Sequence, residues 1–197
     1  MKFDLNYVFQ NLAASLKLIL GNVQGLNELD QSASGFWRSF IALLLALPFT
    51  LSAKYSEYNS IVNSADKEHL TILFSWPVTQ ETASVLAYLL TLAVFYEMAR
   101  STGLVARIPP SIIALNWGGL ALIIISFPIV LLTIWMSETN PFLPFVSIFL
   151  IFMFAAAMYN ILRLTLEIPS RPAILYVFVL SVFEIMAYFV LLILASN

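Results

Sequence analysis

Long apolar stretches separated by short polar segments dominate the chain. None of the stretches shows the strict alternation of a membrane β-strand. A helix needs roughly 20 residues to cross the hydrocarbon core, and lipid offers no partners to a backbone that is not helical. The pattern therefore predicts an all-α, polytopic fold with five transmembrane helices, over about 36–53, 83–99, 111–136, 142–162 and 172–196. An earlier start of the second helix, near Trp76-Pro77, is the alternative.

The segment 1–35 has a different pattern and lacks the compact apolar core of a targeting peptide. Its apolar residues recur at spacings of three and four: Leu5, Val8, Phe9, Leu12, Leu16, Ile19 and Leu20. This spacing predicts an amphipathic helix that ends near Gly21, with Asn6, Gln10 and Lys17 off the apolar face. The apolar face either lies in the cytoplasmic membrane interface or packs on the protein's own bundle. A polar linker, 25–35, follows.

Basic residues are distributed unequally between the two sides of the predicted helices. One side holds Lys2, Lys17, Arg38, Arg100, Arg107, Arg163 and Arg171, and the other holds only Lys54 and Lys67. Positive residues favour the cytoplasmic side. We therefore expect a cytoplasmic N-terminus, a C-terminus outside, and an outside loop over 54–82. Within that loop, 70–78 is either interfacial or re-entrant.

Composition agrees with a membrane protein and excludes several other classes. The chain has 61% hydrophobic and 10% charged residues and a mean hydropathy of +0.92. Lys and Arg number 9 against 11 Asp and Glu, so no basic surface for nucleic acid is expected. With no cysteine and one histidine, His69, a His/Cys metal cluster is not expected. No nucleotide or nucleophile motif appears, and we expect no cofactor and no enzymatic activity.

Glu184 is the most unusual polar residue because it falls near the middle of the fifth predicted helix. Ser181 and Tyr188 lie three residues before and four after it, so all three share one face. An ionisable group at that depth costs several kcal/mol in lipid. The functional interpretation is a proton-linked or ligand-binding group. The structural interpretation is a protonated carboxyl that hydrogen-bonds a neighbouring helix.

A second set of polar residues falls near the cytoplasmic ends of the predicted helices. Glu97 precedes Arg100 by three residues, which predicts a local ion pair, and Arg163 and Glu167 have the matching i,i+4 spacing. Similar depth also favours a candidate cytoplasmic-side polar cluster. Its members would be Glu97, Asn116, Asn160 and Arg163.

Two stripes on the predicted helices concern packing. Small residues at Ala114, Gly118 and Ala121 predict close approach of another helix. Aromatic residues at Phe142, Phe145, Phe149 and Phe152 form a packing or lipid-facing stripe. The expected partners are the lipid bilayer and, through helix packing, another protein or a second copy of the chain.

The order of parts, a polar N-terminal segment and then five close spans, resembles the Yip1-like membrane proteins. Two stretches, Gly35-Phe36-Trp37-Arg38-Ser39-Phe40 and Leu115-Asn116-Trp117, are similar to an uncharacterised group of small bacterial inner-membrane proteins. The resemblance implies a non-enzymatic protein with a membrane-organising or scaffold role and transfers no catalytic residues. The alternative function is a small oligomeric transporter or channel that uses Glu184.

Overall fold

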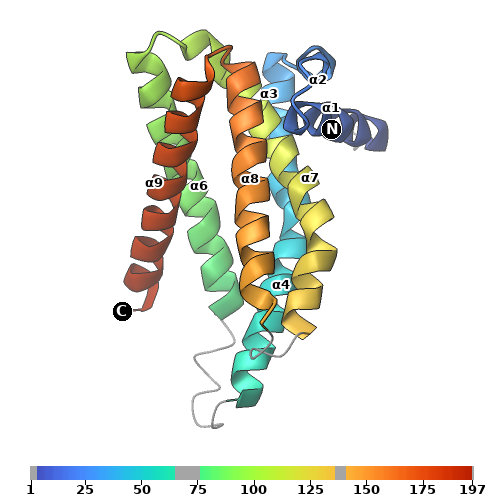
Figure 1. The fold of residues 1–197 in the computed structure, drawn as a ribbon, viewed down its shortest axis with the longest axis vertical. Coiled ribbons are helices and arrows are strands. Elements are labelled where there is room, and N and C mark those ends of the chain that lie inside the picture. The colour runs from blue at the N-terminus through green and yellow to red at the C-terminus, as the bar shows by residue number, and fades with distance from the viewer. Residues whose placement is uncertain (1–3, 65–75, 136–140, 197) are drawn as a thin grey trace.

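The computed structural model describes residues 4–64, 76–135 and 141–196, and the regular elements in those ranges are helical (Figure 1). In chain order they are α1 Leu5–Ile19, α2 Gln24–Glu28, α3 Ala33–Ser39, α4 Ile41–Ser64, α6 Trp76–Ser101, the 3₁₀ helix η2 Val105–Arg107, α7 Ile108–Trp135, α8 Leu143–Thr165 and α9 Ser170–Ser196. Five helical stretches are long and apolar enough to cross a membrane, as predicted. The first of them combines α3 with most of α4.

The first two spanning helices are longer than predicted. Helix α4 continues to Ser64, and α6 begins at Trp76, the alternative start. Much of the expected outside loop, 54–82, is therefore helical, which corrects that prediction. The cause is that polar residues such as Lys54 and Glu81 find partners inside the bundle and do not end the helices. Lys67, His69 and 70–75 lie outside the described residues.

The spanning helices run along one direction and share two apolar cores (Figure 1). Helix α9 packs along α6, and α4 packs along α7, while α8 contacts both α7 and α9. One core joins α1, α4, α7 and α8 around the fully buried Trp117. The other joins α6, the start of α7, α8 and α9 around Phe95, Leu162 and Leu180. The two cores hold the five spans as one bundle.

The predicted stripe of small residues is a real helix contact. Ala114 and Ala121 are buried on α7. A Cβ atom added to Gly118 would come within 2.7 Å of Ile161 Cδ1 on α8, whereas one added to Gly119 would meet nothing within 4 Å. Of these two glycines, only Gly118, which is on the stripe, has a neighbour that a larger side chain would displace. The aromatic stripe of α8 is different, because Phe142, Phe145, Phe149 and Phe152 are all exposed on the protein surface.

Helix α1 lies crosswise to the spans, at the end of the bundle where α6 ends and α7 begins (Figure 1). We call this the α1 end and the opposite one the far end; the C-terminus lies at the far end. Gly21 follows α1 with a φ of +82°, a conformation that favours glycine and ends the helix as predicted. At Gly25 a Cβ atom would meet the Ala14 carbonyl oxygen at 2.3 Å, so glycine lets α2 pack tightly on α1.

Candidate intramembrane polar site

A buried hydrogen-bonded chain links three helices on the α1 side of the bundle. The Tyr88 hydroxyl of α6 donates to Asn116 Oδ1 of α7. Asn116 Nδ2 donates to Ser39 Oγ of α3 at 2.8 Å, and Ser39 Oγ donates to the Phe36 carbonyl at 2.7 Å. Asn116 and Ser39 are almost completely buried. Buried polar groups need such partners, so this chain fixes α3, α6 and α7 relative to one another.

Glu184 lies beside this chain. It is on α9, which packs on α6, and its side chain is half-buried and interacts electrostatically with the Tyr88 hydroxyl. The two residues that share its face have other neighbours. Ser181 Oγ lies 4.0 Å from Met158 Sδ of α8, and Tyr188 interacts electrostatically with Glu57 and Glu81. The predicted trio therefore has no single partner: Glu184 and Tyr188 both have neighbours on α6, Tyr188 also has one on α4, and Ser181 faces α8.

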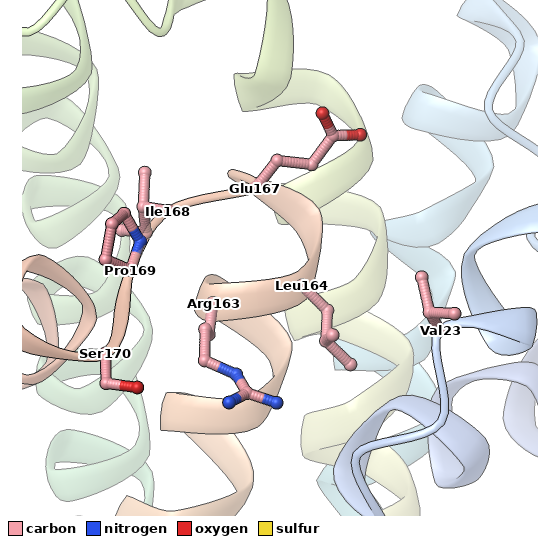
Figure 2. A pocket seen from close by; sticks show the side chains of 7 residues that line it. All are labelled: Val23, Arg163, Leu164, Glu167, Ile168, Pro169 and Ser170. Atoms are coloured by element: carbon pink, nitrogen blue, oxygen red, sulfur yellow. The ribbon is translucent and has the colours of Figure 1, made fainter.

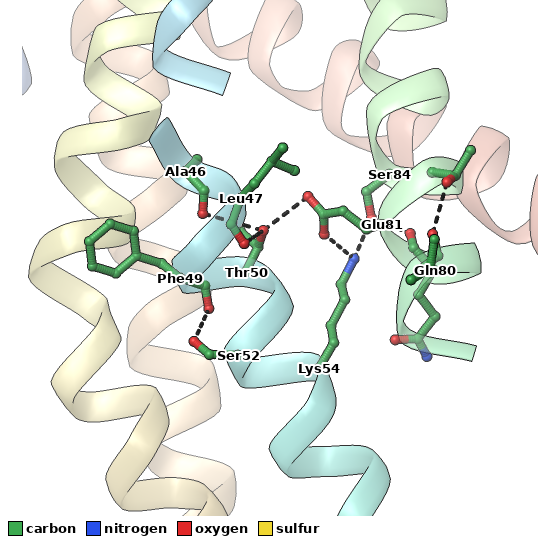
Figure 3. Close-up of polar contacts among 11 residues, drawn as sticks. Ala46, Leu47, Phe49, Thr50, Ser52, Lys54, Gln80, Glu81 and Ser84 are labelled. Atoms are coloured by element: carbon green, nitrogen blue, oxygen red, sulfur yellow. Dashed lines mark hydrogen bonds and ion pairs between the residues drawn. The ribbon is translucent and has the colours of Figure 1, made fainter. Parts of the chain in front are cut away.

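A buried ion pair between α4 and α6 continues the polar residues toward the far end (Figure 3). Lys54 Nζ lies 2.8 Å from Glu81 Oε2, with only 19% and 13% of the two side chains exposed. Thr50 Oγ1 donates to Glu81 Oε1 at 2.9 Å, and Lys54 Nζ also donates to Ser84 Oγ at 3.0 Å. Both charges thus have additional hydrogen bonds, which offset part of the cost of removing them from water.

Sequence reasoning missed this pair because it placed both residues in a loop. A signal was present. Thr50 and Lys54 lie four residues apart, and Glu81 and Ser84 three apart, so each pair shares one helix face if the helices are extended. What the sequence did not reveal was the length of the helices. The polar residues lower the hydropathy at the end of α4 and at the start of α6, so both helices were predicted too short.

The four residues of the predicted cytoplasmic-side cluster are each engaged elsewhere. Glu97 pairs with Arg100 at 3.6 Å on the exposed surface of α6, which confirms the local ion pair. Asn116 belongs to the buried chain described above. Asn160 Nδ2 donates to the carbonyl of Ile19 at the end of α1, at 2.8 Å, and the Arg163 guanidinium lies 5.6 Å from the centre of the Tyr159 ring. None of these contacts joins two members of the cluster.

The predicted pair of Arg163 with Glu167 does not form. Helix α8 ends at Thr165, and Glu167 has a φ of 54°, so it has left the helical spacing. Its carboxylate instead pairs with Arg107 of η2 at 2.5 Å. An i,i+4 pair requires both residues in one helix, and the C-terminal end of α8 comes too early for that.

Charged and polar groups also fasten α1 to the bundle. Lys17 Nζ lies 2.5 Å from Glu28 Oε1 of α2. Tyr7 packs edge-on against Trp117, with ring centres 6.0 Å apart, and the Arg38 guanidinium lies 5.4 Å from the centre of the Tyr7 ring. Burial, followed by the nearby Asp30 carboxylate, raises the pKa of Tyr7 to about 12. A hydrogen bond from the Ser32 hydroxyl is the main cause that lowers the pKa of Asp30.

Within the described ranges, no group of three or more His, Asp or Glu side chains could hold a metal ion. Comparisons with protein-family models, with curated proteins and with solved structures find no match to this chain. The function must therefore be argued from the residues and their geometry alone.

Proposed function

We propose that the protein is a non-enzymatic, membrane-organising protein that acts on the bilayer through α1. The proposal places it in a bacterial inner membrane, with the α1 end in the cytoplasm and the C-terminus outside. The seven-to-two distribution of basic residues supports the orientation. The single observation that carries the function is the exposed apolar face of a helix held firmly across the bundle.

The depth of α1 supports this function. Its Tyr7 contacts Trp117, which lies roughly 14 Å along α7 from the first residue at 1.5 Å per residue. In Figure 1, α1 accordingly lies below the connections that end the bundle. A crosswise helix at that depth lies at the boundary between headgroups and acyl chains.

The three faces of α1 agree with such a position. One face, with Asn11, Ala14 and Leu18, is buried against the bundle. A second face carries Gln10 and Lys17, which bond to α2 on the side toward the end of the bundle. The third face is apolar and free of the bundle: Leu5, Phe9 and Leu20 are 59%, 64% and 82% exposed.

The sequence left two positions open for the apolar face, packing on the bundle or lying in the membrane interface, and different residues of α1 suit each of them. The bundle takes Val8, Leu12 and Ile19 of the apolar stripe together with the small and polar residues beside it, while Leu5, Phe9 and Leu20 remain available to lipid. The exposed apolar face of α1 would insert into one leaflet of the bilayer like a wedge. Because the five spans hold α1 in place, the insertion would expand that leaflet and bend the bilayer.

Reconstitution of the full chain into phospholipid vesicles tests the proposal. We expect the wild-type protein to produce smaller or tubular vesicles, and a Phe9→Glu/Leu20→Glu variant to lose this effect. Both side chains are exposed, so the variant should fold. The matched control is Gln24→Glu/Asn27→Glu, which adds the same charges at exposed positions of α2, away from the apolar face of α1. Equal vesicle shapes with wild type and with the Phe9/Leu20 variant would contradict the proposal.

The second candidate, a small transporter or channel, is supported by one specific observation. Polar side chains follow Glu184 in both directions: Tyr88 and Asn116 toward the α1 end, and Glu81 and Lys54 toward the far end. A proton pathway needs such continuity. Proton flux driven by a pH gradient in liposomes, compared between wild type and Glu184→Gln, tests this candidate.

A further inference from the structure

An open cavity of about 280 Å³ lies at the α1 end, between the loop after α1 and the turn that joins α8 to α9 (Figure 2). Its lining combines one cation, one hydroxyl and an apolar wall. The lining residues are Val23, Arg163, Leu164, Glu167, Ile168, Pro169 and Ser170. We propose that this cavity binds the phosphate headgroup of an anionic phospholipid, an inference that does not depend on the membrane-organising role of α1.

Arg163 is the anion-binding group of the cavity. Its guanidinium points into the space between Val23 and Ser170, as Figure 2 shows. Lys17, Lys54, Arg100 and Arg107 each pair with a carboxylate. Among the described residues Arg163 has an aromatic ring as its neighbour and no carboxylate. A planar guanidinium with free N–H groups matches the geometry of phosphate oxygens.

Glu167 also lines the cavity but does not oppose an anion there. Its carboxylate is turned away from Arg163 in Figure 2 and is bound by Arg107 at 2.5 Å. On the other side, the Ser170 side chain supplies a hydroxyl, and the neighbouring Arg171 is exposed and, in the described part of the chain, has no carboxylate partner. The cavity and its rim are therefore electropositive.

The position of the cavity favours a lipid over a free phosphate ion. It lies where one spanning helix, α8, ends and the next, α9, begins, which is the depth of the headgroups. Directly along α9 from Ser170, the exposed side chains Ile174, Leu175 and Phe178 form an apolar surface for acyl chains. Val23, Leu164 and Pro169 give the cavity itself an apolar wall that a hydrated phosphate would not use.

Titration of the purified full chain in detergent with phosphatidylglycerol, read by native mass spectrometry and thermal stabilisation, tests the assignment. We expect saturable binding that Arg163→Gln weakens by about tenfold or more, the worth of one charge-assisted hydrogen bond. The matched control is Arg100→Gln, which removes a cation at the same end but outside the cavity. Binding that is equal in wild type and Arg163→Gln, or equally weakened in Arg100→Gln, would overturn the assignment.

A second variant keeps the test decisive if Arg163→Gln does not fold. Val23→Glu places a carboxylate on the exposed rim, and Asn22→Glu places one on the same loop outside the cavity. Only the first should weaken phosphatidylglycerol binding. Inorganic phosphate that stabilises the protein as well as the lipid does would overturn the lipid assignment in favour of a free-ion site. All four variants keep the apolar face of α1, so vesicle shaping is scored separately.

Discussion

Lys54 and Glu81 are a pair whose individual charges the membrane would not tolerate. Two charges removed from water are stable only while each has the other and its hydrogen bonds. Lys54→Met should therefore destabilise the protein by about 3 kcal/mol, because Glu81 keeps its burial and loses its cation. The double variant Lys54→Met/Glu81→Met should recover most of that loss. Chemical denaturation in detergent micelles measures both, and a double variant as unstable as the single one would contradict this account.

Substitutions of the single side chain Glu184 distinguish the two candidate functions. If it only joins α9 to α6, Glu184→Gln should fold with little loss, and Glu184→Leu should cost on the order of 1 kcal/mol, the modest worth of such bonds in membranes. If it carries protons, Glu184→Gln should abolish flux and leave folding intact. Thermal stability of both variants, beside pH-driven flux in liposomes, distinguishes these results. Flux lost specifically in Glu184→Gln would favour the transporter.

At the scale of elements, the contact between α7 and α8 depends on one glycine. Gly118→Val would drive its side chain against the Cδ1 end of Ile161, which is 2% exposed and would have to change its conformation within the core. Overpacking of this kind costs about 2 kcal/mol. Gly119→Val is the control, because it has the same helix propensity change and open space around it. The difference between their denaturation midpoints measures the contact, and equal midpoints would show that the helices can separate.

The start of α3 is held by a short chain of hydrogen bonds that depends on pH. Asp30 Oδ1 accepts from the Ser32 hydroxyl at 2.6 Å, and Ser32 Oγ accepts from the Gly35 N–H at 3.0 Å, which caps the helix. The pKa of Asp30 is lowered below its ordinary value of 3.8. Its stabilisation is therefore complete above that value and is lost as the pH falls through the lowered pKa.

Asp30→Asn provides the measurement for this cap. The amide keeps an oxygen acceptor and cannot titrate between neutral pH and strong acid. The melting temperature of the wild-type protein in detergent should thus fall more between pH 7 and pH 3 than that of Asp30→Asn. Parallel losses in both proteins would mean that other carboxylates dominate the acid response.

At the scale of the whole molecule, an odd number of spans places the termini on opposite sides of the membrane. The basic residues then favour the α1 end in the cytoplasm. Reporter fusions after Asn197 and within 65–68, beyond the end of α4, should both give an outside signal. A cytoplasmic signal from the C-terminal fusion would contradict the proposed orientation. The fusion after Asn22, on the loop beside α2, is the control expected inside.

Features that depend on neighbours along the chain followed from the sequence alone. The five spans and α1 were predictable because apolar periodicity and length are local properties. The stop at Gly21 followed from its freedom to adopt a positive φ, and the Glu97–Arg100 pair followed from a spacing of three on one helix. Each of these needs no knowledge of where another helix lies.

Only the tertiary structure decided which polar residues meet. Lys54 pairs with Glu81, and Asn116 bonds to Tyr88 and Ser39. Glu167 pairs with Arg107 and not with Arg163. These partners are far apart in the chain, and their meeting depends on how long each helix is and how it is rotated about its axis. Helix lengths were underestimated where paired charges reduce local hydropathy, and rotations follow from the packing of both cores. An ion-pair partner inside the bundle offsets the cost of burying a charge. That partner lies in another segment of the chain, so no single segment reveals it.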